Sequence, residues 1–276
     1  MKYAICNEIF EKWPWERVCA FCRELGYNGV EVAPFTIAPH VSLVDAETRS
    51  AMRRIAERME VEILGLHWLL ANVASERQLY VTHPDPDIRA NTADYFLQLT
   101  RLCAELGGHV MVIGSPKSRN LLPGVTRDQA MGYAAEVFRP CLDFAADQKI
   151  TLAFEPLGPK ETDFLNTAAE GVELIERINH PNFRLHLDVK AMSSEPTPIP
   201  DIIKQSARHL AHFHANDPNL LGPGMGEVKF EPIIKALDDA DYDGYLSVEV
   251  FDFKPGAEKI ASESIRYLKK VCRDRS

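Results

Sequence analysis

The feature that most constrains the fold is a regular alternation of short apolar runs with longer amphipathic segments along the 276 residues. Turn-forming residues separate most runs from the segments that follow them. Short, almost continuously apolar runs are typical of parallel strands that are covered on both faces. We count eight such runs, at residues 3–6, 29–33, 61–67, 109–114, 150–155, 183–189, 210–215 and 245–250.

The segments between the runs have the spacing of amphipathic helices. Val18, Phe21, Cys22 and Leu25 are spaced so that they lie on one helix face. Glycine marks two helix ends, in LGYNG at 25–29 and in LGG at 106–108. Comparable helical patterns recur within residues 52–59, 96–106, 130–141, 172–178, 202–203, 233–237 and 265–272.

Eight strand–helix units predict an α/β fold, a single-domain (β/α)8 TIM barrel that spans residues 1–276. A doubly wound open sheet is the alternative. The first run is not followed by the GxGxxG turn of dinucleotide-binding sheets, and no linker or low-complexity segment divides the chain. Both observations favour the barrel. The longest insertion follows the third run, at residues 68–86, where we expect a substrate loop.

Composition narrows the class of protein. The net charge is −9, whereas a protein that follows a nucleic-acid backbone normally needs a basic face. The first residues carry Glu8 and Glu11 and lack the apolar core of a signal peptide, and no run of 18 apolar residues predicts a membrane span. The six scattered cysteines have the pattern of reduced thiols. We therefore expect a cytoplasmic protein that binds neither nucleic acid nor membranes.

Polar residues close four successive runs. Glu155 closes the fifth, and Asp188, His214 and Glu249 lie at or next to the ends of the sixth, seventh and eighth. In a parallel barrel the carboxyl ends of neighbouring strands meet at one face, so these side chains are expected to converge. One such carboxylate is often solvated or caps a helix, but four polar ends in succession predict a metal site. Three carboxylates and one imidazole favour Mn²⁺ or Mg²⁺ and tolerate Co²⁺ or Zn²⁺.

Four more polar residues lie in the same set of runs. His186 and His212 each precede a predicted ligand by two residues, so each points to the same side of its strand one layer deeper. We expect them to be core or supporting histidines. His67 closes the third run and Glu31 lies near the end of the second. We assign both as candidate substrate contacts, with a buried role as the alternative.

The fragments that carry these residues resemble the xylose isomerase-like superfamily of sugar isomerases and epimerases. The closer resemblance is to its branch of D-tagatose 3-epimerases and hydroxypyruvate isomerases, and it covers essentially the whole chain. The order and spacing of the fragments are specific to the superfamily. They are AFEPL with Glu155, HLDV with Asp188, FHANDPN with His214, GPGMGEVKF, and YLSVEVF with Glu249.

The resemblance implies one divalent metal ion per chain, usually Mn²⁺, bound by Glu155, Asp188, His214 and Glu249. It also implies that Glu155 and Glu249 flank a sugar or keto-sugar substrate and act as catalytic acid and base. A Lewis acid lowers the barrier to removing a proton next to a carbonyl, and two carboxylates on opposite faces can move that proton. The implied chemistry is therefore proton transfer through a metal-bound enediolate.

The match to the epimerases is incomplete around the substrate. Glu161, six residues after Glu155, matches a glutamate with which the epimerases contact their substrate. Ala191 stands where they carry a substrate-binding histidine, and Leu220 stands where they carry an arginine. Two polar contacts to sugar hydroxyls are therefore missing, which argues against a standard tagatose or psicose epimerase.

Basic and aromatic residues near the strand ends are candidate replacements for those contacts. Lys117 and Lys190 can bind a carboxylate or phosphate on the substrate. Arg119 either does the same or belongs to a solvated loop. Trp68 is a further candidate substrate contact. The aromatic residues that either form an apolar wall for a sugar or pack in the core are Trp13, Trp15, Phe35 and Trp68.

Three alternative functions use the same type of barrel. Apurinic endonucleases need three zinc ions and further histidines, but residue 191 is alanine and no Asp-x-His pair follows His214. A non-catalytic carbohydrate-binding protein would not need a complete ligand set. Dehydratases of the inosose and dehydroshikimate type share the metal-dependent step and then expel water, and the sequence does not separate them from isomerases.

The sequence therefore predicts a metal-dependent isomerase or epimerase of a sugar or a sugar-derived keto compound, with the dehydratase as the alternative. Related enzymes often form dimers or tetramers, so a homo-oligomer is a further expectation.

Overall fold

The computed structural model describes residues 1–74 and 78–273. In this part of the chain eight parallel strands pair in sequence order and close into a barrel through β8 and β1. The predicted barrel is confirmed and the open sheet is excluded. Each predicted apolar run coincides with one strand, although β1 begins one residue before its run. The strands are β1 (Lys2–Cys6), β2 (Gly29–Val32), β3 (Glu62–Leu66), β4 (Val110–Ile113), β5 (Thr151–Phe154), β6 (Phe183–Asp188), β7 (Leu210–Ala215) and β8 (Tyr245–Val248).

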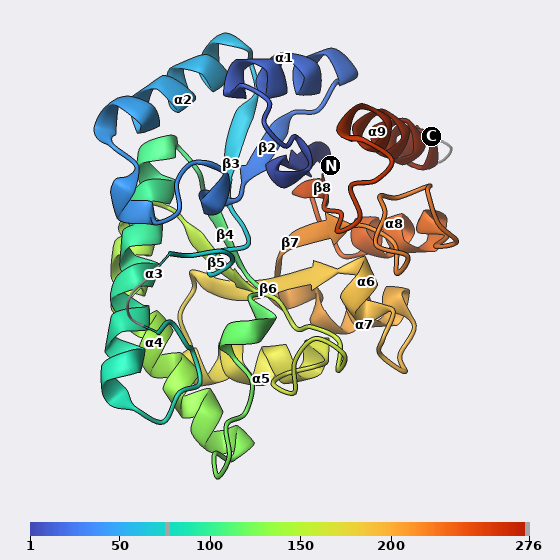
Figure 1. The fold of residues 1–276 in the computed structure, drawn as a ribbon. Coiled ribbons are helices and arrows are strands. Elements are labelled where there is room, and N and C mark those ends of the chain that lie inside the picture. Colours follow the sequence, from blue (N-terminus) through green and yellow to red (C-terminus); the bar gives the residue numbers. More distant parts are fainter. Residues whose placement is uncertain (75–77, 274–276) are drawn as a thin grey trace.

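Helices surround the barrel on its outside (Figure 1). All but α6 fall where the sequence predicts a helix. The helix α6 was missed because a single turn is too short to show helical periodicity. None of the helices in the described ranges is long and apolar enough to cross a bilayer. The helices are α1 (Trp15–Leu25), α2 (Ala46–Arg58), α3 (Pro86–Leu106), α4 (Arg127–Asp147), α5 (Ala168–Ile178), α6 (Val189–Met192), α7 (Ile199–Ser206), α8 (Phe230–Asp239) and α9 (Ala257–Arg273).

Glycines end two of these helices as the sequence predicts. Gly26 follows α1 with φ 86°, and Gly107 follows α3 with φ 85°. Both φ angles lie in the left-handed region, which glycine adopts without a steric penalty. A residue in this conformation ends the helix that precedes it. At the other end of a unit, Thr126 and Gln129 form a capping box that begins α4. Local chemistry therefore fixes several of the boundaries.

The barrel interior changes character along its axis. A separate apolar cluster inside the ring of strands consists of Ala4, Leu64, Val110, Ala153 and Tyr245. Side chains alternate between the two faces of a strand, so positions two or four residues further along also face the interior. Those positions include Glu155, two residues after Ala153, and Glu249, four residues after Tyr245. The fold thus places an apolar plug below a polar upper layer.

Two irregularities in strand pairing lie beside this polar layer. The register between β2 and β3 shifts at Val30 and Glu31, and the register between β6 and β7 shifts at Leu185 and His186. Such bulges bend a strand and change the direction of the next side chain. They therefore help to set the positions of Glu31 and His186 beneath the barrel mouth.

The contact between β3 and β4 gives a test of the fold. A Cβ atom on Gly65 would lie 1.7 Å from the backbone oxygen of Val110, a clash that no rotamer change relieves. We expect Gly65→Ala to lower the free energy of unfolding in urea by at least about 2 kcal/mol. The control Gly132→Ala adds a methyl group in α4 where no atom lies within 4 Å. It should be neutral or stabilising by up to about 1 kcal/mol. Equal stability of the two variants would contradict the packing of β3 on β4.

Candidate active site

Four predicted ligands converge at the carboxyl end of the barrel. Glu155 follows β5, Asp188 ends β6, His214 lies in β7 and Glu249 follows β8. Their exposed fractions are 6%, 1%, 0% and 3%. Ligand atoms of Asp188, His214 and Glu249 lie within 4.8 Å of one another, and Asp188 is also within that distance of Glu155 and His186. The structure thus gathers the four side chains and adds His186 as a nearby donor.

The electrostatics of this cluster fit a bound cation. Burial, followed by repulsion from Glu249 and Asp188, raises the pKa of Glu155 well above its ordinary value. Burial and Glu249 raise the pKa of Asp188 to about 6. Like charges that share a desolvated site behave in this way when nothing positive lies between them. A set of carboxylate oxygens and one imidazole nitrogen suits a hard divalent ion.

A carboxylate beneath the site holds His214. The Nε2 atom of His214 lies 3.3 Å from both oxygens of Glu31, and its Nδ1 atom lies 3.1 Å from Oε2 of Glu249. His212 also contacts Glu31, at 2.7 Å. Metal-binding histidines are commonly oriented by a carboxylate on the ring nitrogen away from the ion. Glu31 has this relation to His214.

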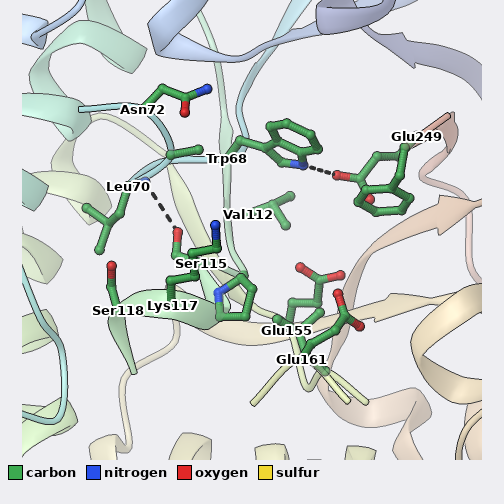
Figure 2. A pocket seen from close by; sticks show the side chains of 15 residues that line it. Trp68, Leu70, Asn72, Val112, Ser115, Lys117, Ser118, Glu155, Glu161 and Glu249 are labelled. Carbon is green, nitrogen blue, oxygen red and sulfur yellow. Dashed lines mark hydrogen bonds between the residues drawn. The ribbon is translucent and has the colours of Figure 1, made fainter. Parts of the chain in front are cut away.

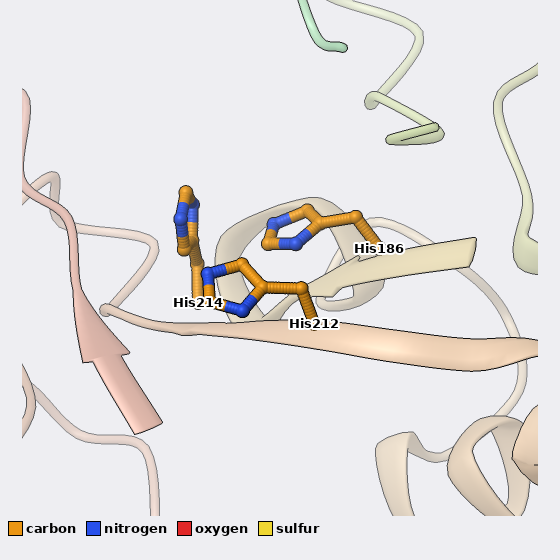
Figure 3. A group of neighbouring side chains, drawn as sticks. All are labelled: His186, His212 and His214. Atoms are coloured by element: carbon orange, nitrogen blue, oxygen red, sulfur yellow. The ribbon is translucent and has the colours of Figure 1, made fainter. Parts of the chain in front are cut away.

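The histidines lie together under the site (Figure 3). The rings of His186 and His214 are edge to face with centroids 4.1 Å apart, and His212 lies 5.3 Å from His214. His186 is fully buried, and neither of its ring nitrogens has a hydrogen-bond partner in the described residues. His212 occupies the supporting layer that the sequence predicts. His186 lies there too, but close enough to Asp188 to be a further donor.

Asp188 is fixed by two donors. The backbone N–H of Ala191 donates to Oδ1 at 2.8 Å, and the side-chain amide of Asn216 donates to Oδ2 at 2.5 Å. Asn216 in turn accepts the backbone N–H of Lys190. Asn216 was not among the predicted site residues. It follows His214 by two residues, so the alternation of side chains along β7 could have indicated that it faces the barrel interior. Asp188 thus caps α6 and still presents its carboxylate to the cluster.

A pocket of about 390 Å³ opens above the cluster (Figure 2). Trp68 forms one wall, stacked between Phe35 at 5.8 Å and Phe251 at 5.9 Å. Its indole N–H donates to Oε1 of Glu249 at 2.7 Å. Trp68 has a φ of 51°, which is strained for a bulky residue and is typical of functional sites. The structure therefore places Trp68 and Glu249 together in the pocket wall.

The other aromatic candidates lie in different places. Trp13 packs against Phe10 and Phe21, with ring centroids 5.3 and 5.5 Å away. The indole N–H of Trp15 donates to the carbonyl of Met52. Trp13 thus packs against α1, and Trp15 connects α1 to α2, so both tryptophans have the packing role. Phe251, which was not among the predicted aromatic candidates, forms the pocket wall together with Trp68.

Glu161 and Lys190 form a partly buried ion pair at the pocket edge. Their Oε1 and Nζ atoms are 2.7 Å apart, with side chains 30% and 12% exposed, and the ammonium lies 4.4 Å from the ring centre of Phe251. Burial alone would lower the pKa of Lys190, but Asp188 and Glu161 raise it. The lysine therefore carries its charge beside the cluster. Leu220, at the position where the resemblance leads one to expect an arginine, is 42% exposed.

Two basic residues of the loop after β4 have different surroundings. Lys117, on the 3-10 helix η4 (Pro116–Ser118), is exposed and lines the pocket on the side away from the glutamates (Figure 2). Arg119 is only 1% exposed, and its Nη1 atom donates to the backbone carbonyl of Glu155 at 2.7 Å. Burial lowers the pKa of Arg119 to about 10. Arg119 therefore belongs neither to a solvated loop nor to the pocket wall, because it turns inward to bind the backbone at the end of β5.

His67 and Glu31 lie beneath the pocket and do not line it. Each is 0% exposed. Nδ1 of His67 is 3.4 Å from Oε1 of Glu249, and its Nε2 is 2.9 Å from Oε2 of Glu8. The structure thus favours the buried role for both residues over the expected substrate contact, since neighbouring side chains cover them. Glu8 was missed because its position directly after β1 marks it only as a polar loop residue.

The loop after β3 takes part in the pocket as expected. Trp68, Leu70, Ala71 and Asn72 of the predicted substrate loop line it. The backbone N–H of Leu70 donates to the hydroxyl of Ser115, which links this loop to the loop after β4. Residues 75–77 of the same loop lie outside the described residues.

Comparisons with known proteins agree with the fold. A family model described as a xylose isomerase-like TIM barrel matches residues 19–271. The chain is 27% identical over 230 residues to the D-psicose 3-epimerase of Agrobacterium fabrum, covering 83% of this chain and 76% of that protein. It is 27% identical over 171 residues to the L-ribulose 3-epimerase of Methylomonas sp., covering 62% of this chain and 60% of that protein.

A solved structure has the same fold over its whole length. A crystal structure of D-psicose 3-epimerase, determined in the presence of D-fructose, superposes with a TM-score of 0.84 and 23% sequence identity. The superposition covers 98% of each chain. It supports the barrel architecture and the absence of any large insertion relative to that protein.

The cluster predicts an unusual pH dependence of stability in chelator-treated protein. The pKa of Glu155 is raised in the folded state, so its favourable contribution is present below its ordinary pKa and is lost as the pH rises through the raised value. We therefore expect metal-free Glu155→Gln to melt at a higher temperature than wild type at about pH 8, with a smaller difference at about pH 4. Circular dichroism measures both. A difference that is independent of pH would contradict the repulsion, and Glu173→Gln, on the surface, is the control.

Proposed function

The chain belongs to the xylose isomerase-like TIM-barrel family, and from that premise we propose that it is a metal-dependent ketose epimerase. In this proposal it exchanges a proton on the carbon next to a ketose carbonyl, as the names of its 3-epimerase relatives indicate for those proteins. One observation carries the proposal. Glu155 and Glu249 line the same pocket and belong to the same buried cluster as Asp188 and His214.

The four side chains Glu155, Asp188, His214 and Glu249 would hold one divalent ion, for which we propose Mn²⁺. When bound, the ion would act as a Lewis acid on the substrate carbonyl and so make the adjacent C–H more acidic. The protein contributes preorganisation: Asn216 holds Asp188, and the side chains beneath the site hold His214 and Glu249. Fixed dipoles and charges of this kind need no rearrangement during the reaction.

The two glutamates differ in ways that suit proton exchange. Oε1 of Glu249 accepts the Trp68 N–H, and Oε2 lies 3.1 Å from Nδ1 of His214. Burial alone would raise the pKa of Glu249, but His214 and His67 lower it below its ordinary range. Glu155 has a raised pKa, chiefly because of burial. We propose that, in one direction of the epimerisation, Glu249 removes the proton from the substrate carbon and Glu155 supplies a proton to its opposite face. In the reverse reaction the two glutamates exchange roles.

The rest of the pocket would bind the sugar. We propose that Glu161 and Lys190 contact hydroxyls near the reacting carbon, because their ion pair lies at the pocket edge beside Phe251. Lys117, on the opposite side, would contact the far end of the substrate. Trp68 supplies an apolar face. Lys190 and Lys117 would stand in for the two polar residues absent at Ala191 and Leu220.

The epimerase is favoured over the alternatives. The relatives reported above are 3-epimerases, which favours proton exchange over the loss of water in a dehydratase. Homo-oligomerisation, a cytoplasmic location and the lack of nucleic-acid binding stay predictions from the sequence.

Proton exchange can be followed directly. We expect Mn²⁺-loaded protein, screened in D₂O against ketoses that include D-psicose and L-ribulose, to convert the ketose that it accepts into a product with one deuterium at carbon 3, detected by NMR. Glu249→Gln and Glu155→Gln should each lower the rate by at least about 10²-fold, the usual contribution of a general acid or base. The surface variant Glu173→Gln should retain the wild-type rate. Epimer formation without deuterium, or full activity in either active-site variant, would contradict the mechanism.

The role of Lys190 has a separate test. Lys190→Gln removes the cation but keeps a polar side chain, so KM for the ketose should rise about tenfold while kcat changes less. The control Lys235→Gln breaks a Lys–Asp pair on the surface of α8 and should leave both constants unchanged. A wild-type KM in Lys190→Gln would show that the lysine does not contact the substrate.

A further inference from the structure

A row of three buried ionisable side chains runs from the end of β1 to the candidate active site. Oε2 of Glu8 lies 2.9 Å from Nε2 of His67, and Nδ1 of His67 lies 3.4 Å from Oε1 of Glu249. Their side chains are 1%, 0% and 4% exposed. These two contacts meet the distance of an ion pair, but the angles at the His67 nitrogens are not those of hydrogen bonds. The row connects Glu8, outside the predicted ligand set, with a residue inside it.

The pairing with His67 is the main compensation for burying Glu8. Neither carboxylate oxygen of Glu8 has a hydrogen-bond partner in the described residues. A carboxylate without a partner in the interior is strongly destabilising, and removing one member of a buried pair leaves the other uncompensated. Replacing a buried ion pair by apolar residues of similar size is often neutral or stabilising. The stability of the fold therefore does not explain why Glu8 and His67 are present, and their effect on neighbouring side chains is the alternative.

The segment that carries Glu8 is held rigidly. Glu8 lies in the 3-10 helix η1 (Asn7–Ile9), directly after β1. The side chain of Asn7 accepts the backbone N–H of Ala33 at 2.8 Å and donates to the hydroxyl of Thr36 at 2.9 Å. These bonds connect η1 to the loop after β2. Glu8 is therefore a fixed point from which the orientation of His67 can be set.

We propose that Glu8 is a positioning residue of the active site, which holds His67 against Glu249 and thereby fixes the Glu249 carboxylate for metal binding and proton transfer. The inference rests on the proposed function. With His67 and the Trp68 N–H on the Oε1 side, Oε2 is left to face His214 and the other candidate ligands. Glu8 pairs with Nε2 of His67, and Nδ1, on the other side of the ring, is the nitrogen that lies 3.4 Å from Oε1 of Glu249.

The test uses Glu8→Gln, which keeps the size of the side chain and removes its charge. Chelator-treated protein is titrated with Mn²⁺ in a calorimeter, and kcat and KM for a ketose are measured at saturating Mn²⁺. Supporting residues of metal sites typically contribute about 10- to 100-fold in metal affinity or activity. We therefore expect a loss of that size in Mn²⁺ affinity, in kcat or in both, with KM nearly unchanged. Glu8→Asp, which retains a carboxylate, should recover part of the loss.

A matched control exists at the other end of the barrel. Glu62 pairs with His109 at 3.2 Å, but this pair lies at the start of β3 and is 40–45% exposed. Glu62→Gln should leave Mn²⁺ affinity and kcat at their wild-type values. It separates an effect of position from the general effect of breaking a Glu–His pair.

The outcomes are decisive. Folded Glu8→Gln with wild-type Mn²⁺ affinity and wild-type kcat, even with a lower melting temperature, would show a merely structural pair and overturn the proposal. If Glu8→Gln does not fold, His67→Gln decides in the same way, because it removes the contact from the other side. If wild-type protein binds Mn²⁺ but epimerises no ketose, the proposed function fails and the affinity measurement still decides the role of Glu8.

Discussion

The burial of several carboxylates at one end of a closed barrel is the constraint on which the rest of the structure depends. Glu155, Asp188 and Glu249 are almost inaccessible to water, and their mutual repulsion in a desolvated site is unfavourable. A barrel whose upper interior were apolar would avoid this penalty. The donors around the cluster, such as Asn216 on Asp188, orient the carboxylates without neutralising all of them. In the proposed function, a divalent cation would complete the balance of charge.

The positions of the four candidate ligands were predictable because they follow from strand geometry. Apolar runs fix where strands lie, a parallel barrel fixes which ends meet, and the two-residue alternation fixes which side chains face inward. Those rules place Glu155, Asp188, His214 and Glu249 together before any coordinates are known. They also place His212 one layer deeper, where the structure has it beside Glu31.

The supporting residues were not predictable, because their roles depend on contacts between loops far apart in sequence. Glu8 reaches His67 across 59 positions of the chain, and a polar residue after a strand does not reveal its partner. Arg119 was expected either to bind an anionic group of the substrate or to lie in a solvated loop, but it turns inward and donates to the Glu155 carbonyl. The sequence left a substrate contact and a buried role open for His67 and Glu31, and side-chain packing covers both. Periodicity gives the direction of a side chain but not what covers it.

The central claim is that the four strand-end side chains hold one divalent ion, and metal content per chain tests it most directly. Elemental analysis should be made on wild type and on Asp188→Ala, each purified without chelators and then reconstituted with Mn²⁺. We expect about one ion per wild-type chain and close to none in the variant, since one of four ligands is lost. Wild-type protein that retains no ion after reconstitution, or a variant that retains the full amount, would contradict it.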